Sequence, residues 1–144
     1  MFTTSRIDLR LAACAGVLVV LMLPAAARAG RAYFVFDYPP APEQFVIKLN
    51  RPEQIAQARR ILSGEESGAV HIMGTVVKRP TRWNAPWRFH LAPKSIQFFE
   101  LAIEVCDASI QYVDDHLDEV GGAFLPGSVW CPWGSRLLAE IPRP

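Results

Sequence analysis

The sequence predicts a single small α+β domain, in which a mainly antiparallel sheet of about four to five strands is packed by one long and one short helix. Short aromatic and β-branched segments with alternating polarity indicate the strands. Two segments with apolar residues at intervals of three and four indicate the helices. No repeat, low-complexity tract or linker interrupts residues 30–144, so one domain accounts for this part of the chain.

The first two strands are expected at Tyr33–Phe36 and Phe45–Leu49. In the second of them, apolar residues at odd positions alternate with Val46 and Lys48, a pattern typical of a strand with one buried face. Further strands are expected at Val70–Lys78 and Trp87–Leu91, and Ser135–Ile141 is a candidate edge strand.

The short helix is expected to begin after Asn50 and to end at Ser63. Asn50 can cap its N-terminus, and Pro52 suits its first turn because the missing N–H has no helical partner there. Gly64 can adopt the left-handed conformation that terminates helices. The buried positions recur at helical spacing and are Ile55, Ala58 and Leu62.

The long helix is expected from Pro93 to about Leu117, with Gly121 beyond its end. At 1.5 Å per residue it would run about 37 Å. Because its apolar stripe is wide, we expect it to lie across the sheet. The stripe includes one cysteine and consists of Ile96, Phe99, Ile103, Cys106, Ile110, Val113 and Leu117.

Residues 1–29 have the organisation of a secretory signal peptide. Arg6 and Arg10 precede an uncharged apolar run, Leu11–Ala27, and small residues at Ala27 and Ala29 favour cleavage after Ala29. A membrane anchor is the alternative, but the run is shorter than the ~20 apolar residues that a span needs. We therefore expect a secreted, periplasmic or extracellular protein.

Cleavage would leave a nearly neutral chain with two cysteines. It removes three arginines and one aspartate, which changes the formal net charge from +1 to −1. Nothing in this balance calls for a nucleic acid or an anionic membrane as partner. In an exported protein, Cys106 and Cys131 are expected to form one disulfide, and two buried free thiols are the alternative.

Six strings stand out in the domain: Tyr33–Phe36, Phe45–Leu49, Ile61–Glu66, Trp87–Leu91, Ala102–Asp107 and Trp130–Trp133. As a set, they resemble the N-terminal domain of an amoebal calmodulin-binding protein and a group of secreted bacterial proteins similar to it. The resemblance covers nearly the whole of residues 30–144 and implies no catalytic residues. Calmodulin binding itself is not supported by the sequence, because calmodulin targets are basic amphipathic helices and the expected long helix is acidic.

Acidic residues gather along the expected long helix, and no Lys or Arg occurs between Lys94 and Arg136. The functional interpretation is a surface for a basic partner or for divalent cations. The alternative is a solvated face, or a face paired with arginines from elsewhere in the fold. The spacing lacks the pattern of a calcium loop, so we expect no metal site. The candidate acidic surface consists of Glu100, Glu104, Asp107, Asp114, Asp115 and Asp118.

A basic, tryptophan-rich hairpin loop over residues 78–88 is the candidate ligand-binding site. It could bind an unknown protein or glycan ligand by charge and stacking. A protease-inhibitor loop, with Lys78 or Arg79 as the specificity residue, is the second function. The structural alternative is a loop whose tryptophans pack inward and whose cations pair with the acidic helix. The candidate residues are Lys78, Arg79, Arg82, Trp83, Trp87 and Arg88.

No pattern of a catalytic or cofactor site is present in the sequence. The serines lack the spacing of a nucleophile elbow, and the histidines His71, His90 and His116 lack that of a metal-binding pair. Cys106 lies on the core stripe, where a thiol is a poor nucleophile. We therefore expect a non-catalytic binding module without a cofactor.

Overall fold

The computed structural model describes residues 30–102 and 105–144. The expected signal peptide, residues 1–29, and the candidate residue Glu104 therefore lie outside the described residues. Among the residues that are described, no helix is long and apolar enough to cross a membrane.

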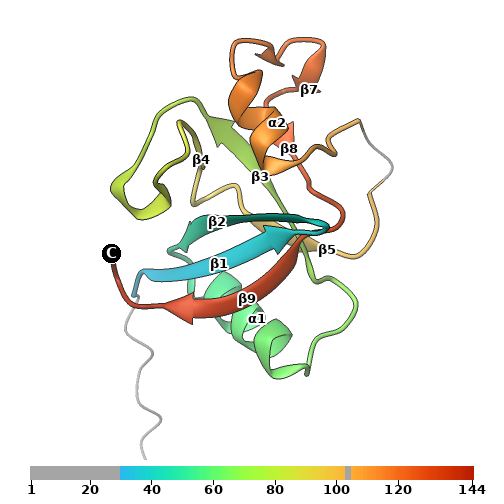
Figure 1. Cartoon of the computed structure of the whole chain (residues 1–144). Coiled ribbons are helices and arrows are strands. Elements are labelled where there is room, and N and C mark those ends of the chain that lie inside the picture. Colours follow the sequence, from blue (N-terminus) through green and yellow to red (C-terminus); the bar gives the residue numbers. More distant parts are fainter. Residues whose placement is uncertain (1–29, 103–104) are drawn as a thin grey trace, which may run out of the picture.

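The first sheet joins the two ends of the domain (Figure 1). It contains β1 (Ala32–Tyr38), β2 (Ala41–Leu49) and β9 (Arg136–Ile141). The order is β2-β1-β9, and both pairings are antiparallel. Because Phe34 lies opposite Ile47, these two buried side chains share the inner face of the sheet.

The second sheet is centred on β3 (His71–Val77), which pairs antiparallel with three short strands. Residues 78–88 connect β3 to the next strand and contain a short 3-10 helix, η1 (Arg82–Asn84). A separate parallel pair, β6 (Val120–Gly121) and β7 (Phe124–Pro126), lies beyond the second helix. The partners of β3 are β4 (His90–Leu91), β5 (Gln97–Phe99) and β8 (Val129–Trp130).

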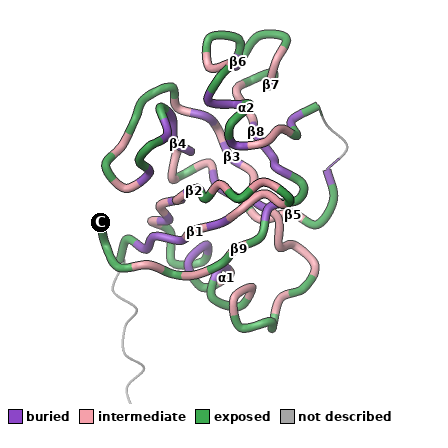
Figure 2. The backbone as a smooth tube through the Cα atoms, in the orientation of Figure 1, coloured by how far each residue is buried: buried purple, intermediate pink, exposed green. Residues whose placement is uncertain are grey.

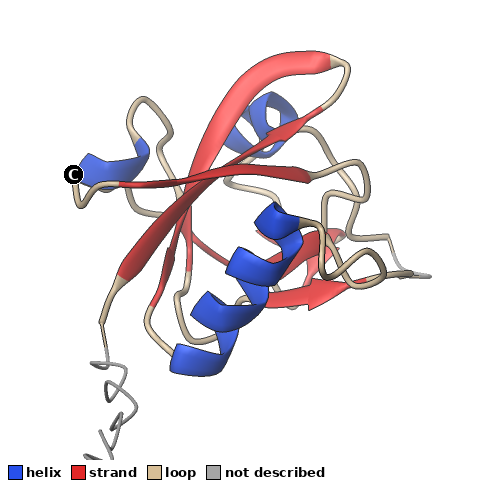
Figure 3. Ribbon diagram, turned by 90° about the horizontal axis from the view of Figure 1, so that it is seen from below, coloured by secondary structure: helices blue, strands red, loops and turns tan. Residues whose placement is uncertain are grey.

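Two helices complete the fold: α1 (Pro52–Ser63) and α2 (Ile110–Asp115). Helix α1 runs across the strands of the first sheet (Figure 3) and buries Ile55 and Ala58. An ion pair between Arg59 and Glu140, with nitrogen and oxygen 2.8 Å apart, joins α1 to β9. This hydrogen bond from Arg59 lowers the pKa of Glu140, against a smaller opposing effect of burial.

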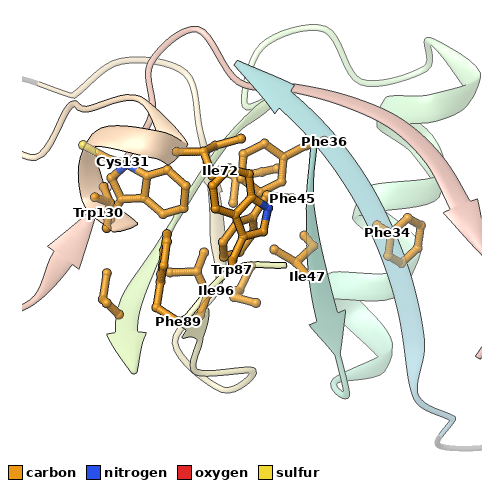
Figure 4. Packing of buried hydrophobic residues seen from close by; sticks show 14 of the residues in the cluster. Phe34, Phe36, Phe45, Ile47, Ile72, Trp87, Phe89, Ile96, Trp130 and Cys131 are labelled. Atoms are coloured by element: carbon orange, nitrogen blue, oxygen red, sulfur yellow. The ribbon is translucent and has the colours of Figure 1, made fainter. Parts of the chain in front are cut away.

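Aromatic rings fill the core between the two sheets (Figure 4). The Trp130 ring lies 5.3–5.9 Å from the ring centroids of Phe36, Phe45 and Phe89. Its Nε1 donates to the carbonyl of Ala108 at 2.9 Å, so the buried polar group has a partner. Figure 2 shows that buried residues gather on the strands at the centre of the domain, whereas one side of α1 is exposed.

The prediction of a single small, sheet-rich and mainly antiparallel α+β domain is confirmed. The predicted strands at Tyr33–Phe36, Phe45–Leu49 and Ser135–Ile141 lie within or over β1, β2 and β9. The strand expected at Trp87–Leu91 is reduced to β4. Gly64 ends α1 in the left-handed conformation, with φ of 80°.

The predicted long helix from Pro93 to about Leu117 is wrong. The described residues of that segment form β5, a loop and the six-residue α2. Ile96–Phe99 is rich in β-branched and aromatic residues, which favour a strand. Ser109 begins a new helix, because its Oγ accepts from the Tyr112 N–H at 3.2 Å. Ile96, Cys106 and Ile110 belong to separate segments, and each of these segments buries an apolar side chain in the same core. Their spacing in the sequence therefore resembles that of a helix without requiring one.

The predicted N-cap is also wrong, because Arg51 occupies the cap position of α1 without a side-chain hydrogen bond. The predicted disulfide is confirmed: Cys106 and Cys131 are bonded, with Cα atoms 5.2 Å apart. The Cys131 N–H also donates to the Cys106 carbonyl at 2.8 Å. The segment after β8 is therefore tied to the loop before α2, although the described residues between Pro93 and Leu117 form no long helix.

Candidate functional site

The loop over residues 78–88 covers the free edge of β2, the outer strand of the first sheet. The Asn84 Oδ1 accepts from the Val46 N–H at 2.7 Å, and its Nδ2 donates to the Phe89 carbonyl at 3.0 Å. The Trp87 Nε1 donates to the Gln44 carbonyl at 2.7 Å. These bonds satisfy backbone groups that an edge strand would otherwise leave unpaired.

Trp87 therefore packs inward, as the structural alternative for this loop expected. Only 7% of its surface is exposed, and its indole nitrogen is engaged by β2. It is not placed to stack against a ligand in this conformation. Trp83 differs, because it remains half-buried on the outside of the sheet.

We predict that Asn84→Ala lowers the free energy of unfolding by about 2–3 kcal/mol, because it removes two hydrogen bonds and leaves buried groups unpaired. Urea denaturation followed by tryptophan fluorescence measures this change. Asn50→Ala is the matched control, because the Asn50 Oδ1 is buried without a partner. A loss at Asn84 no larger than at Asn50 would show that the edge contacts do not stabilise the loop.

The two ends of the loop reach the acidic segment around α2. The Arg88 N–H donates to the Asp114 Oδ1 at 2.8 Å, and its Nε lies 3.0 Å from Oδ2. The Lys78 Nζ donates to the Asp118 carbonyl at 3.4 Å. Asp114 is only 9% exposed, and its carboxylate is paired with Arg88. Pairing between the loop and the acids, the structural alternative, is therefore present at Arg88.

The candidate acidic residues do not form one helical face in the described residues. Asp107 accepts from the Tyr38 hydroxyl at 3.1 Å and from the Trp133 N–H at 3.0 Å. Burial and, to a lesser degree, Asp107 raise the pKa of Tyr38. Asp115 accepts from Gln111 within α2, whereas Glu100 is exposed after β5. They come from different elements because the long helix that would align them does not form.

Trp83 lies on the outer face of the first sheet, beside residues of β1 and β2. Tyr33 and Lys48 are opposite each other in the register and project away from the inner face. The Trp83 ring centroid lies 6.1 Å from that of Tyr33 and 5.1 Å from the Lys48 Nζ. At this distance the ammonium is attracted to the indole ring. The His90 ring also packs against the indole, with ring centroids 5.6 Å apart.

Two further cations lie near Lys48. Burial lowers the pKa of Lys48, and the charges of Arg31 and Arg143 lower it further. These arginines flank the start of β1 and the end of β9, which are neighbours because Tyr33 pairs with Ile141. Among the described residues, no carboxylate lies within 4.0 Å of the side-chain nitrogens of these three cations. We call Arg31, Lys48, Trp83 and Arg143 the Trp83 surface; Tyr33 is only 5% exposed and packs against Trp83.

The predicted ligand-binding loop is thus divided between structural and accessible positions. Trp83 joins the Trp83 surface, and the exposed Arg82 precedes it in the chain. Lys78 and Arg79 are exposed at the turn after β3, so the inhibitor interpretation stays a prediction. Of the cations that the sequence analysis missed, the outward position of Lys48 could be read from the alternation in β2. No local signal shows that Arg31 and Arg143 come together.

The described residues contain no cluster of three or more His, Cys, Asp or Glu side chains arranged to hold a metal ion. Each histidine Nδ1 instead lies within hydrogen-bonding distance of a backbone carbonyl. The distances are 3.1 Å from His71 to Ser135, 2.8 Å from His90 to Arg79 and 2.8 Å from His116 to Tyr112.

Comparison with known proteins identifies the family but no individual relative. No curated protein and no solved structure matches the chain. The family model of the BP-74 N-terminal domain matches residues 30–144, which include every strand and helix described above. The match agrees with the resemblance carried by the strings in β1, β2 and the segment around the disulfide. The chain therefore belongs to the BP-74 N-terminal domain family.

Proposed function

We propose that this domain is a secreted, non-catalytic binding module and that the Trp83 surface binds an anionic group of its ligand. The observation that carries the proposal is that three cations gather at one end of the first sheet without a carboxylate partner among the described residues: Tyr33 pairs with Lys48 on one side and with Ile141 on the other, which places Arg31 and Arg143 near Lys48. Like charges held together repel one another, and a bound anion relieves that repulsion. The ligand is a protein or glycan that carries carboxylate, sulfate or phosphate groups.

The rigidity of the surface supports this proposal. Lys48 is held against the Trp83 ring, and both lie on a sheet whose edge is covered by Asn84. Cations fixed in advance lose less conformational entropy on binding than free side chains do. The exposed Arg82, next to Trp83, offers a further positive charge to a long anionic ligand. The disulfide is compatible with secretion into an oxidising compartment.

The test uses heparin, a sulfated polysaccharide, and polyglutamate as probes. Lys48→Gln and Arg143→Gln are each expected to weaken binding of the preferred probe roughly three- to tenfold at low salt, because each removes one charge from the site. Isothermal titration calorimetry at several salt concentrations measures this. The bound probe should also raise the pKa of Lys48, followed by NMR of its side chain.

Lys94→Gln is the matched control, because it removes an exposed lysine from the turn before β5 and leaves the Trp83 surface intact. The proposal is wrong if this control weakens binding as much as Lys48→Gln does. It is also wrong if neither probe binds, or if binding does not depend on salt.

A further inference from the structure

A groove separates α1 from the edge of the second sheet. Its volume is about 610 Å³, and its lining comes from both elements. On the α1 side, Glu53, Gln57 and Arg60 recur at spacings of four and three, so they form one stripe along the helix. On the other side the lining includes Gln97 and Phe98 of β5. In Figure 1, α1 lies below the first sheet, and β5 lies near the C-terminal end of β1.

The backbone of β5 has a free edge at this groove. Phe98 lies opposite Ile72 in β3, and the Ile72 N–H donates to the Ser135 Oγ at 2.9 Å. In an antiparallel pair of strands, directly opposed residues alternate between those that bond to each other and those whose N–H and C=O groups point outward. Because the Ile72 N–H bonds to Ser135, Ile72 and Phe98 are a pair of the second kind. The N–H and C=O of Phe98 therefore face away from β3. No loop or side-chain hydrogen bond among the described residues reaches them.

Ile96, two positions before Phe98 in the chain, shows which element the free edge of β5 faces. The Ile96 carbonyl, which shares the direction of the Phe98 peptide groups, accepts from the Gln54 Nε2 and from an Arg51 nitrogen at 3.5 Å. Both donors belong to α1 or the residue that precedes it. The free edge of β5 therefore opens toward α1 and into the groove. An unpaired strand edge beside a helix is the geometry in which extended peptides add a strand to a sheet.

The charge of the groove limits the sequence of such a peptide. Arg51 is paired with Glu53, with nitrogen and oxygen 3.4 Å apart. Arg60 is exposed, and no described carboxylate lies within 4.0 Å of its guanidinium. An acidic side chain on the added strand would give Arg60 a partner. Polar side chains along the α1 stripe favour a polar outer face on that strand.

We propose that this groove binds an extended peptide segment of a partner protein, which pairs with β5 through the N–H and C=O of Phe98 and places an acidic side chain against Arg60. The backbone contacts supply affinity without regard to sequence, and Arg60 supplies the preference for an acidic residue. This site is separate from the Trp83 surface, and neither proposal depends on the other.

A random heptapeptide library displayed on phage is the probe, with the purified protein as target. Enriched sequences should be rich in β-branched residues and carry Glu or Asp at a fixed position. Hydrogen exchange followed by NMR should show a fast Phe98 amide in the free protein and a protected one with a synthetic enriched peptide bound. Enrichment of no sequence would overturn the proposal, as would a bound peptide that leaves the Phe98 amide unprotected.

Charge exchange tests the acidic preference. Arg60→Glu should weaken binding of the enriched acidic peptide roughly tenfold, and replacing the peptide's acidic residue by Lys should restore binding to this variant. Lys94→Glu is the matched control, because it reverses an exposed charge that lies outside both the groove and the Trp83 surface, and it should leave peptide binding unaltered. Equal effects of the two variants would overturn the assignment of the site.

Hydrogen exchange of the Phe98 amide in the protein without peptide tests whether the same chain or a second copy covers the edge of β5. If the Phe98 amide is protected at every protein concentration, another segment of the same chain covers β5. If its protection rises with concentration, a second copy covers it. Either result would overturn the assignment to a partner's peptide.

Discussion

Trp130→Ala is expected to lower the free energy of unfolding by about 4–5 kcal/mol, near the upper end for truncation of a large core aromatic residue. Trp130 has no exposed surface, and its ring packs against Phe36 and Phe45 of the first sheet and against Phe89, the residue before β4. The change would leave a cavity at the junction of the sheets and remove the donor to the Ala108 carbonyl. Urea denaturation followed by circular dichroism measures the loss.

Trp133→Ala provides the control within the same segment. Trp133 is 40% exposed, and its hydrogen bond to Asp107 uses the backbone N–H, which alanine keeps. We expect this variant to lose less than about 1 kcal/mol, as most exposed substitutions do. Similar losses at the two tryptophans would contradict the central position of Trp130 in the core.

Replacing both Cys106 and Cys131 by serine is expected to cost about 3.5 kcal/mol, because the crosslink closes a 25-residue separation and restricts the unfolded chain. For a domain of this size, the melting temperature should fall by roughly 15 °C. Differential scanning calorimetry under non-reducing conditions measures both quantities.

A reducing agent gives an independent measurement of the same crosslink. It should lower the melting temperature of the wild-type protein to about that of the double variant and leave the variant unchanged. A wild-type protein that melts at the same temperature with and without reductant would contradict the stabilising role of the disulfide.

Elements whose signals are local could be predicted from the sequence. The alternation in Phe45–Leu49 predicts a half-buried strand, and β2 is one. Pro52 and Gly64 mark the ends of α1 through their own backbone preferences. The segment after Pro93 could not be predicted in this way, because apolar spacing alone does not distinguish one long helix from several segments that face the same core.

The candidate sites depend on contacts between distant parts of the chain. The outward direction of Lys48 follows from the alternation of its strand, so the position of Lys48 on the outer face could be predicted from the sequence. Arg31 and Arg143 are 112 positions apart and meet because β1 pairs with β9. The free edge of β5 likewise depends on which strands pair with β3. No local pattern in the sequence specifies that pairing.

The position of β9 also constrains the order in which the molecule can assemble. β1, near the beginning of the domain, is the central strand of its sheet, and its neighbour on one side is β9, the last strand of the domain. During synthesis, β1 can pair with β2 soon after the hairpin emerges, but its other side stays unpaired until β9 has been made. A nascent polypeptide stalled before Arg136 would thus expose the edge of β1 to other chains, and the sheet can be completed only after Ile141 has emerged.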